Sequence, residues 1–587
     1  MSKSQSSAPA GPRRAVRALG AVLLLATSAA GAIDITVDVL GDPPPNGCTP
    51  GDCSLREAVS LANSLAGPDR VLLPATPGLP LQLSIPGGGD DVNATGDLDV
   101  LDDLEIVGTG AATTTVAQTA ADRVLHTIMD DDQRLVLRGL TLQGGRASEG
   151  GGLYSTSLVT IEDAAFVGND ATFEGGAINF FGPGAPSITE FRLVMRRVRF
   201  ESNTAMQLDG ARGGALDALS FFGGRPFVLI EDCEFIDNEA KDGGGAIHVT
   251  GFPNNFGGNV VIRRSRFTGN RSGGEGGGAI LATASSFRVQ IEDSDFDANV
   301  ATGNNTDAAG AVNLDGVGSA DVLRSTFSSN TGVRGGGLRS NPQLATRIVD
   351  SLWSDNVASL GAGAVWGVRD MLVERSTFES NRVTSTDSAD PGGGAIGFQG
   401  GQSGSLAIQR STFSGNDAFR GGAISLVAGA LQLYGSTIVA SQFGMVGQSA
   451  TALRILDETS GNPLAIANTL IRGSCSFPSA GRQLAVAYNN IESSGATCRL
   501  TTAVINAQNQ VNASAAQIAL GPLANNGGPT PTRLPGALSI AINAGRESFC
   551  TATDQRHFAR ADASCDIGAV ELGATPSTGA VFANGFE

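Results

Sequence analysis

A repeat in the middle of the chain constrains the fold more than any other feature of the sequence. Between about residue 137 and residue 430, an aromatic residue, an asparagine three positions later and a Gly-Gly-Ala-Ile-like step return every ~25–35 residues. The aromatic slot holds Phe166, Phe200, Phe235, Phe267, Phe296, Phe327, Trp353, Phe378 and Phe413. The asparagine slot holds Asn169, Asn203, Asn238, Asn270, Asn299, Asn330, Asn356, Asn381 and Asn416. Such a period predicts stacked repeats in place of one ordinary core.

The residues before each aromatic predict short strands. The fifth residue before it is apolar in every copy, as in Ile161 and Met195, and the second is small, as in Ala164 and Ser265. Inward-facing residues thus alternate with outward-facing ones, except at one point where two consecutive residues face outward. This pattern indicates two strands that meet at a corner. A helical period of about 3.6 residues does not fit.

Charges alternate between repeats in the outward slot three residues before the aromatic. This slot holds Asp163, Arg197, Asp232, Arg264, Asp293, Arg324, Asp350, Arg375 and then Arg410. If each repeat is one coil, these side chains lie about 4.8 Å apart up the stack, where opposite charges attract and like charges repel. The alternation therefore predicts that consecutive repeats stack in register.

These patterns predict an all-β fold, a parallel β-helix (solenoid) with one repeat per coil. The aromatic residues form an internal stack, and the asparagines form a hydrogen-bonded ladder at a turn. We expect the structural ladder to include Asn169, Asn203, Asn238 and Asn270 beside the alternating charges. The Gly-Gly steps mark the next corner of the coil. A phosphate-binding loop is the alternative interpretation, but no lysine or capped helix follows these glycines.

Composition narrows the class further. The chain has 80 Gly without a Gly-X-Y period, which excludes collagen, and 41% hydrophobic residues, which exclude wholesale disorder. A formal net charge of −18 argues against a nucleic-acid partner. We expect no membrane-spanning segment in the mature chain, because no later run is apolar for long enough.

Residues 1–32 have the features of a secretory signal peptide. Lys3, Arg13, Arg14 and Arg17 precede an apolar run at 19–26, and Ala30-Gly31-Ala32 fits a small-residue cleavage site. The Arg13-Arg14 pair is a feature of the twin-arginine export pathway, but the full motif of that pathway is not present around it. The sequence thus predicts a secreted protein, extracellular or on the cell surface of a bacterium.

Seven cysteines in an exported chain predict disulfides with one cysteine left over. Sequence proximity favours Cys48–Cys53, Cys475–Cys498 and Cys550–Cys565. Cys233 remains, and because it fills the small inward slot of its repeat, we expect a buried, unreactive thiol.

Two segments resemble known families of bacterial secreted proteins. Cys53-Ser54-Leu55-Arg56-Glu57-Ala58 is similar to the CSLREA segment that opens many right-handed parallel β-helix proteins, which implies a right-handed coil. Residues 54–65 also predict an amphipathic helix with a Ser54/Glu57 capping box, able to cover the open end of the solenoid.

The segment from 520 to 572 is similar to the choice-of-anchor Q domain found C-terminal to such helices. The match rests on Asn526-Gly527-Gly528-Pro529-Thr530, Ala541-Ile542-Asn543-Ala544-Gly545, Thr553-Asp554-Gln555-Arg556 and Asp566-Ile567-Gly568-Ala569-Val570-Glu571. Asn543, Arg533 and His557 depart from that pattern, where the family has Asp, His and Gly. The departures argue against an inherited ion or catalytic site there.

The repeats also resemble those of chlamydial polymorphic outer membrane proteins, whose passenger segments are associated with adhesion. The chain ends in Phe582-Ala583-Asn584-Gly585-Phe586-Glu587, which resembles a short sorting or processing tail of exported proteobacterial proteins. We therefore expect a signal peptide (1–32), an N-terminal cap (33–105), a β-helix (106–510), a choice-of-anchor Q-like domain (511–572) and a tail (573–587).

Catalytic residues do not stand out in the sequence. Most acids fall in the alternating ladder, where ion pairing explains them, and Asn305-Thr306-Asp307 matches one polygalacturonase motif without its histidine-containing companion. His126, His248 and His557 share no metal-ligand spacing, and Asp130-Asp131-Asp132 is typical of a solvated turn. We expect no metal site and no cofactor; calcium is an option without supporting residues.

Aromatic residues in the connections after the Gly-Gly corners are candidate binding loops. They are Phe180, Phe181, Phe221, Phe222, Phe252 and Phe256. Stacked coils would bring them to one side as an exposed apolar strip, and loops folded over the edge of the helix are the alternative.

The sequence therefore predicts a secreted or cell-surface binding, adhesin-like or structural module, with a glycan or a surface protein as partner and no catalytic site. The alternative is an extracellular polysaccharide lyase or glycoside hydrolase that binds a carbohydrate along the β-helix.

Overall fold

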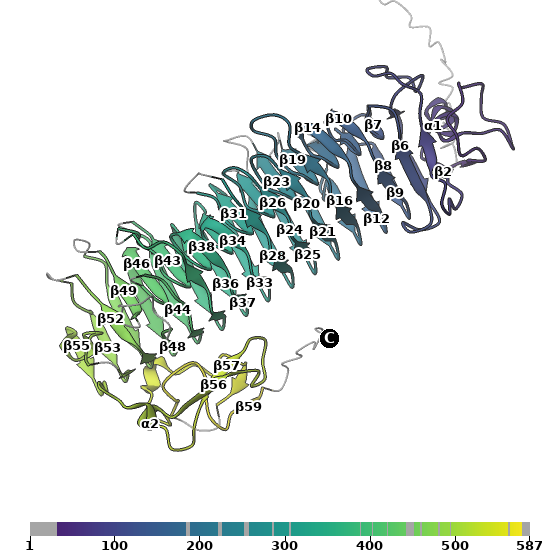
Figure 1. Cartoon of the computed structure of the whole chain (residues 1–587). Helices are drawn as coiled ribbons and strands as arrows, with labels where there is room; N and C mark the ends of the chain where they lie inside the picture. Colours follow the sequence, from purple (N-terminus) through teal and green to yellow (C-terminus); the bar gives the residue numbers. More distant parts are fainter. Residues whose placement is uncertain are drawn as a thin grey trace, which may run out of the picture.

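The protein is a right-handed parallel β-helix, as the sequence predicts, with a short helix at its N-terminal end and a small β-rich segment at its C-terminus (Figure 1). This computed structural model describes residues 32–577 except 184–187, 221–225, 252–257, 284–286, 304–306, 388, 402, 420, 442–450, 458–460, 479–481, 494 and 561–563. The signal peptide-like residues 1–31 and the tail residues 582–587 lie outside the described part.

Each full coil contains four short strands, one in each of four parallel sheets. In one coil these are β12 (Leu158–Glu162), β13 (Ala165–Val167), β14 (Asp170–Glu174) and β15 (Ile178–Gly182). We number the sheets 1 to 4 in that order; within the described residues they contain 17, 15, 9 and 14 strands. Sheet 1 runs from β1 (Asp34–Thr36) to β55 (Ile505–Ala507), so stacked strands begin inside the range predicted as an N-terminal cap.

The corner between sheets 1 and 2 is made by the alternating charged residues. All nine of them, from Asp163 to Arg410, have a φ between 47° and 54°. This left-handed conformation turns the chain outward and explains the two-residue bend between the inward positions.

The corner before sheet 4 depends on glycine. Gly175 has a φ of 63°, and a Cβ on Gly176 would lie 2.1 Å from the carbonyl oxygen of Gly214 in the next coil. No side chain fits so close to a neighbouring backbone, and this explains why the Gly-Gly step returns with each coil.

The interior is a column of stacked residues. From Phe235 to Phe327 the ring centroids are 4.6 Å apart, and the planes lie within 8° of parallel. Trp353 continues the column with its ring fully buried. Each fully buried aromatic side chain contributes about 1.5–3 kcal/mol by transfer from water.

The asparagine ladder closes the turn between sheets 2 and 3. Nδ2 of Asn270 donates to Oδ1 of Asn299 (2.9 Å) and to the carbonyl oxygen of Phe235 (2.9 Å). Its own Oδ1 accepts from the backbone N–H and Nδ2 of Asn238 (3.1 and 3.0 Å). The same contacts repeat at Asn169 and Asn203, so the fully buried amides are satisfied by neighbouring coils.

The N-terminal end of the solenoid is covered by α1 (Leu55–Ser64). Ser54 and Glu57 form the predicted capping box, and Leu55, Ala58 and Val59 are buried in the core. Arg56 is also fully buried: it pairs with Asp42 (2.8 Å) and donates to the carbonyl oxygens of residues 95–97. A residue with this many partners fixes the helix to the first coils.

The C-terminal segment lies along the flank of the last coils (Figure 1). It contains α2 (Ala515–Ile518) and the antiparallel pair β56 (Leu520–Ala524) and β57 (Thr532–Pro535). Gln555 joins it to sheet 2: its Nε2 donates to Thr377 Oγ1 (2.8 Å), and its Oε1 accepts from Thr412 Oγ1 (2.6 Å). The segment therefore docks on the side of the stack.

Candidate functional site

The second residues of the sheet 4 strands form a column that points away from the core. The strands are β4 (Leu98–Val100), β7 (Leu125–Thr127), β11 (Leu153–Ser155), β15, β19 (Leu216–Ser220), β23 (Ile247–Gly251), β27 (Ile280–Thr283), β31 (Val312–Asp315), β35 (Leu338–Asn341) and β39 (Val365–Gly367). Register pairing stacks Asp99, His126, Tyr154, Asn179, Asp217, His248, Leu281, Asn313, Arg339 and Trp366. We call this set the outer column.

The first six residues of the outer column are polar or ionisable. Asp99, Asn179, Asp217 and His248 are nonetheless buried, because neighbouring side chains and backbone cover them. Buried polar groups cost free energy unless they are fully paired. A column of them outside the core is therefore a candidate functional site.

Asp217 and His248 form a buried pair in this column, with His248 Nδ1 in hydrogen-bond contact with Asp217 Oδ1. The other ring nitrogen of His248, Nε2, is buried and has no hydrogen-bond partner within the described part of the chain. A carboxylate that orients an imidazole whose second nitrogen stays free is an arrangement able to move a proton.

Glu174 lies beside this pair, at the end of β14. Burial, together with the nearby carboxylates of Asp217 and Glu149, raises its pKa to about 7, although Arg212 acts in the opposite direction. Glu174 pairs in register with Glu149 (in β10, Arg146–Glu149) on one side and with Arg212 on the other. The site thus holds a carboxyl group that changes protonation near neutral pH.

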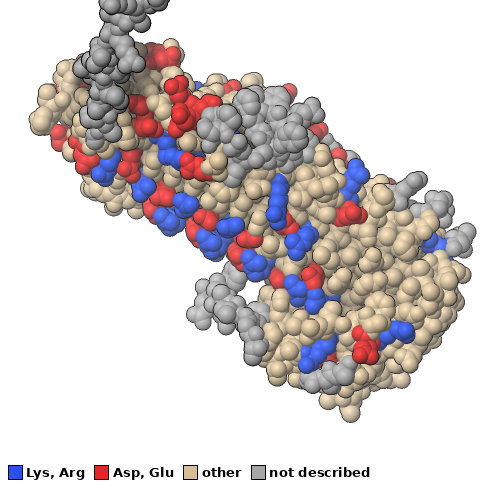
Figure 2. Space-filling view, turned by 180° about the vertical axis from the view of Figure 1, so that it is seen from behind, with Lys and Arg blue, Asp and Glu red and all other residues tan. Residues whose placement is uncertain are grey.

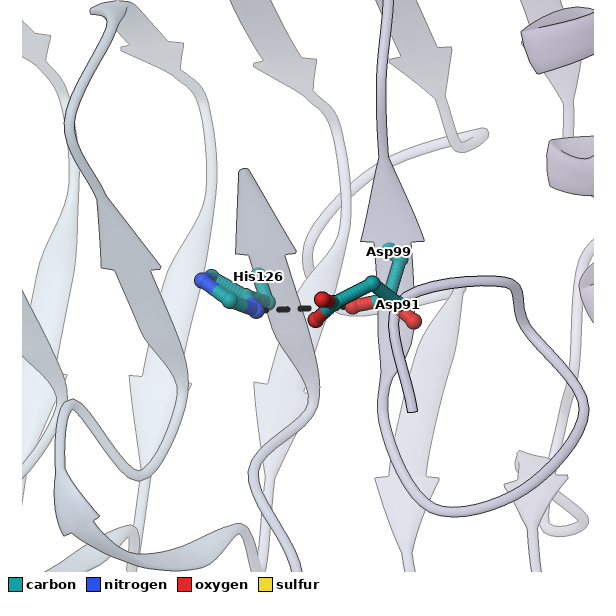
Figure 3. A group of neighbouring side chains, drawn as sticks. All are labelled: Asp91, Asp99 and His126. Carbon is teal, nitrogen blue, oxygen red and sulfur yellow. Dashed lines mark ion pairs between the residues drawn. The ribbon is translucent and has the colours of Figure 1, made fainter. Parts of the chain in front are cut away.

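A second group of ionisable residues lies at the N-terminal end of the outer column (Figure 3). His126 Nδ1 is 3.4 Å from Asp99 Oδ1, and Asp91 turns toward both from the loop before β4. One donor atom from each of the three residues lies within 4.8 Å of the others. Nearby, burial and the Asp122 carboxylate raise the pKa of Asp97 to about 6.

The sequence did not single out Asp99, Glu174 or Asp217. The signal was present, since the residue directly after the apolar residue of each Gly-Gly-Ala-Ile-like step occupies the outer column. His248 and Asn179 stand in that position. Aligning the repeats on this slot, in addition to the aromatic slot, would have revealed the outer column.

The alternating charges pair as neighbours between coils, and Figure 2 shows acidic and basic side chains in turn along the solenoid. Asp232 accepts from Nε and Nη2 of Arg264 (2.8 and 3.0 Å). Asp163 pairs with Arg197 (2.6 Å) and Asp293 with Arg324 (2.7 Å) in the same way. We call these residues the charge ladder.

From Glu162 to Glu292, the residues that directly precede the charge-ladder residues form an unbroken series of ion pairs from coil to coil. Arg196 lies 3.1 Å from both Glu162 and Glu231, and Arg263 reaches Glu231 and Glu292 (3.8 and 3.3 Å). Acids and bases therefore neutralise one another along this edge, in contrast to the outer column.

The candidate binding-loop residues divide into three groups. Phe180 does not lie in an exposed connection, and that prediction is wrong: its ring is fully buried and 5.9 Å from Phe227, because it occupies an inward position of β15. Phe181 is partly exposed, with its ring 5.6 Å from Tyr154. Phe221, Phe222, Phe252 and Phe256 lie outside the described residues.

The three predicted disulfides are confirmed. Cys48–Cys53, Cys475–Cys498 and Cys550–Cys565 are bonded, and Cys233 is free and buried. Burial raises the pKa of the Cys233 thiol to about 12, which keeps it protonated and unreactive.

The remaining residues noted in the sequence have structural contacts. His557 Nε2 lies 2.8 Å from Asp350 Oδ1 and joins the C-terminal segment to the charge ladder. Asp307 pairs with Arg339 (3.2 Å), and Asp130 and Asp132 are exposed in a turn. Neither helix in the described part of the chain has the length and apolar character needed to cross a bilayer.

The sequence is similar to one family model, the Chlamydia polymorphic membrane protein repeat, over residues 232–250. No curated protein matches it. Among solved structures, the Azotobacter vinelandii mannuronan C-5 epimerase AlgE6 A-module is 14% identical, covering 62% of this chain and 96% of that one, with a TM-score of 0.35. A PL6 alginate lyase in complex with a trisaccharide is 11% identical, covering 87% and 92%, also with a TM-score of 0.35. These values are too low to transfer an activity or a substrate.

Proposed function

We propose that this chain is an exported, surface-associated β-helix module that binds a glycan along the outer face of sheet 4. The observation that carries the proposal is the outer column, which sets hydrogen-bonding side chains on six successive strands. His126 and Tyr154 are the partly exposed members of these six, and polar groups that repeat about every 4.8 Å suit an extended chain of hydroxyl-bearing units.

The charge ladder supports this assignment by contrast. Its carboxylates are satisfied by arginines of neighbouring coils and have few free hydrogen-bonding atoms to offer. In the outer column, by comparison, Tyr154 presents a partly exposed ring, and the buried His248 Nε2 has no partner among the described residues. Aromatic rings with a polar edge are common in binding surfaces.

The proposed location outside the cytoplasm is based on the sequence and on the disulfides. Residues 1–32 resemble a signal peptide, and three disulfides suit an oxidising compartment outside the cytoplasm. We propose that residues 53–65 are a CSLREA segment and that residues 520–572 form a choice-of-anchor Q domain involved in surface retention. A surface protein is the other class of partner for such a module.

A glycan array and a bacterial-cell binding assay test the binding function. We expect Tyr154→Ala to weaken binding of the recognised glycan about tenfold or more, because a contact ring contributes ~1.4 kcal/mol or more. Arg197→Gln, a change in the charge ladder, should leave binding unchanged. If the full chain binds no glycan, or if both variants bind like the parent protein, the proposal is wrong.

Cleavage of the bound polysaccharide is the second candidate function. The specific observation in its favour is Glu174, with a pKa of about 7 beside the Asp217–His248 pair. A carboxyl group with such a pKa can give or take a proton at neutral pH, as lyases and glycoside hydrolases require.

Incubation with uronate-containing and neutral glycans, with and without calcium, tests this activity. Accumulation of unsaturated ends would identify a lyase, and new reducing ends alone would identify a hydrolase. Glu174→Gln should then abolish product formation, whereas the exposed Glu547→Gln should not. Glycan binding without any new ends would leave the chain as a binding module.

A further inference from the structure

The N-terminal end of the outer column brings together three side chains able to bind a metal ion, Asp91, Asp99 and His126. Asp99 is fully buried, and no described residue donates a hydrogen bond to its Oδ1. The nearest group is His126 Nδ1 at 3.4 Å, which is longer than an ordinary N–H···O hydrogen bond of about 2.7–3.2 Å. A buried carboxylate oxygen without a donor calls for a positive partner.

The geometry points to a metal ion as that partner. Two donors bound to one tetrahedral ion at about 2.1 Å are separated by about 3.4 Å, and Asp99 Oδ1 and His126 Nδ1 have that separation. The Asp91 carboxylate is exposed and lies within 4.8 Å of both atoms. Because the Asp91 side chain is exposed, it is free to adjust its position and complete a set of three ligands.

The backbone supports this placement of the ligands. Asp99 and His126 are register partners on adjacent strands β4 and β7, so the stacking of coils holds them together. Asn93 ties the loop that carries Asp91 to β4, because its Nδ2 donates to the carbonyl oxygen of Asp99 (2.8 Å) and its Oδ1 accepts from the Asp99 N–H (2.7 Å).

We propose that Asp91, Asp99 and His126 bind a divalent ion of the zinc class. Imidazole with carboxylates suits Zn²⁺, whereas Ca²⁺ and Mg²⁺ prefer sets made of oxygen alone. Bound there, the ion neutralises two carboxylates and ties the loop before β4 to the first strands of sheet 4. The proposal is independent of any glycan partner.

Isothermal titration of the metal-free full chain with ZnCl₂ tests the site, with CaCl₂ and MgCl₂ in parallel. We expect one zinc ion per chain and weaker binding of the other two. His126→Gln and Asp91→Asn should each raise the Kd at least about tenfold. His557→Gln and Asp132→Asn are matched controls outside the site and should bind zinc like the parent protein.

Asp91 is exposed, so Asp91→Asn tests the site even if other replacements disturb folding. X-ray absorption of the zinc-loaded protein should show one imidazole among oxygen ligands. The proposal is overturned if the parent protein binds no zinc at micromolar concentrations, if His126→Gln binds it equally well, or if the spectrum shows several imidazoles.

Discussion

At the scale of single residues, crowding of carboxyl groups has a cost beside the outer column, where Glu174 lies near Asp217 and Glu149. Its pKa of about 7 in the folded chain lies above the ordinary glutamate value of about 4.5. The folded state therefore binds more protons than the unfolded state between about pH 4.5 and 7, and stability falls as the pH rises through this window.

We predict that Glu174→Gln stabilises the protein at pH 8 and has little effect at pH 4, because the amide removes a buried charge that exists only at the higher pH. Urea unfolding midpoints at the two pH values measure the difference. Glu547→Gln, at an exposed position, should change neither midpoint. An equal shift at both pH values would show that the charge of Glu174 does not matter.

At the scale of elements, the corner between sheets 1 and 2 combines an ion pair with a strained backbone. Arg264 has a φ of 47° and pairs with Asp232, whereas Arg263 ends the extended strand β24 (Asn259–Arg263). Left-handed conformations cost residues other than glycine about 1–2 kcal/mol. Exposed ion pairs contribute less, roughly 0–1 kcal/mol.

We predict that Arg264→Gly is more stable than Arg264→Ala by about 1 kcal/mol, since both lose the ion pair and only glycine adopts the corner freely. The same replacements at Arg263 are the matched control, and there alanine should be better by about 0.5–1 kcal/mol. Chemical denaturation of the four variants measures both differences. The same order at both positions would contradict a left-handed corner.

At the scale of the whole molecule, the C-terminal segment depends on contacts with a solenoid already formed. Gln555 is fully buried and links Thr530 of its own segment to Thr377 and Thr412 of sheet 2. The connection at 508–514 between β55 and α2 is mostly exposed. Loss of docking should therefore appear first in this connection.

We predict that Gln555→Ala increases the rate of proteolysis at 508–514 about tenfold or more, because leaving its partners unpaired costs at least ~1.4 kcal/mol. Limited proteolysis followed by mass spectrometry measures the rate, and the fragment before the cut should keep its β-sheet circular dichroism. Ser548→Ala, an exposed change in the same segment, should be cut like the parent protein. Equal rates for all three proteins would show that Gln555 does not hold the segment in place.

Local patterns in the sequence were enough for the fold. The spacing of Phe235 and Phe267, the asparagine three residues after each, and the alternation of Asp232 and Arg264 each repeat once per coil, so the neighbours that they need are copies of themselves. The three disulfides followed from sequence proximity in the same way. Phe180 was misplaced because a strand and its following connection look alike when both contain aromatic residues.

The candidate sites were decided by tertiary structure. His126 lies one coil after Asp91 and Asp99, and Asp217 lies one coil after Glu174. No motif joins the members of either group, so their chemistry exists only once the coils stack. Burial, which raises the pKa of Glu174, also depends on side chains from several coils. The sequence shows which residues repeat along the chain. The pKa of a carboxyl group and the binding of an ion depend on the groups that surround them in the folded structure.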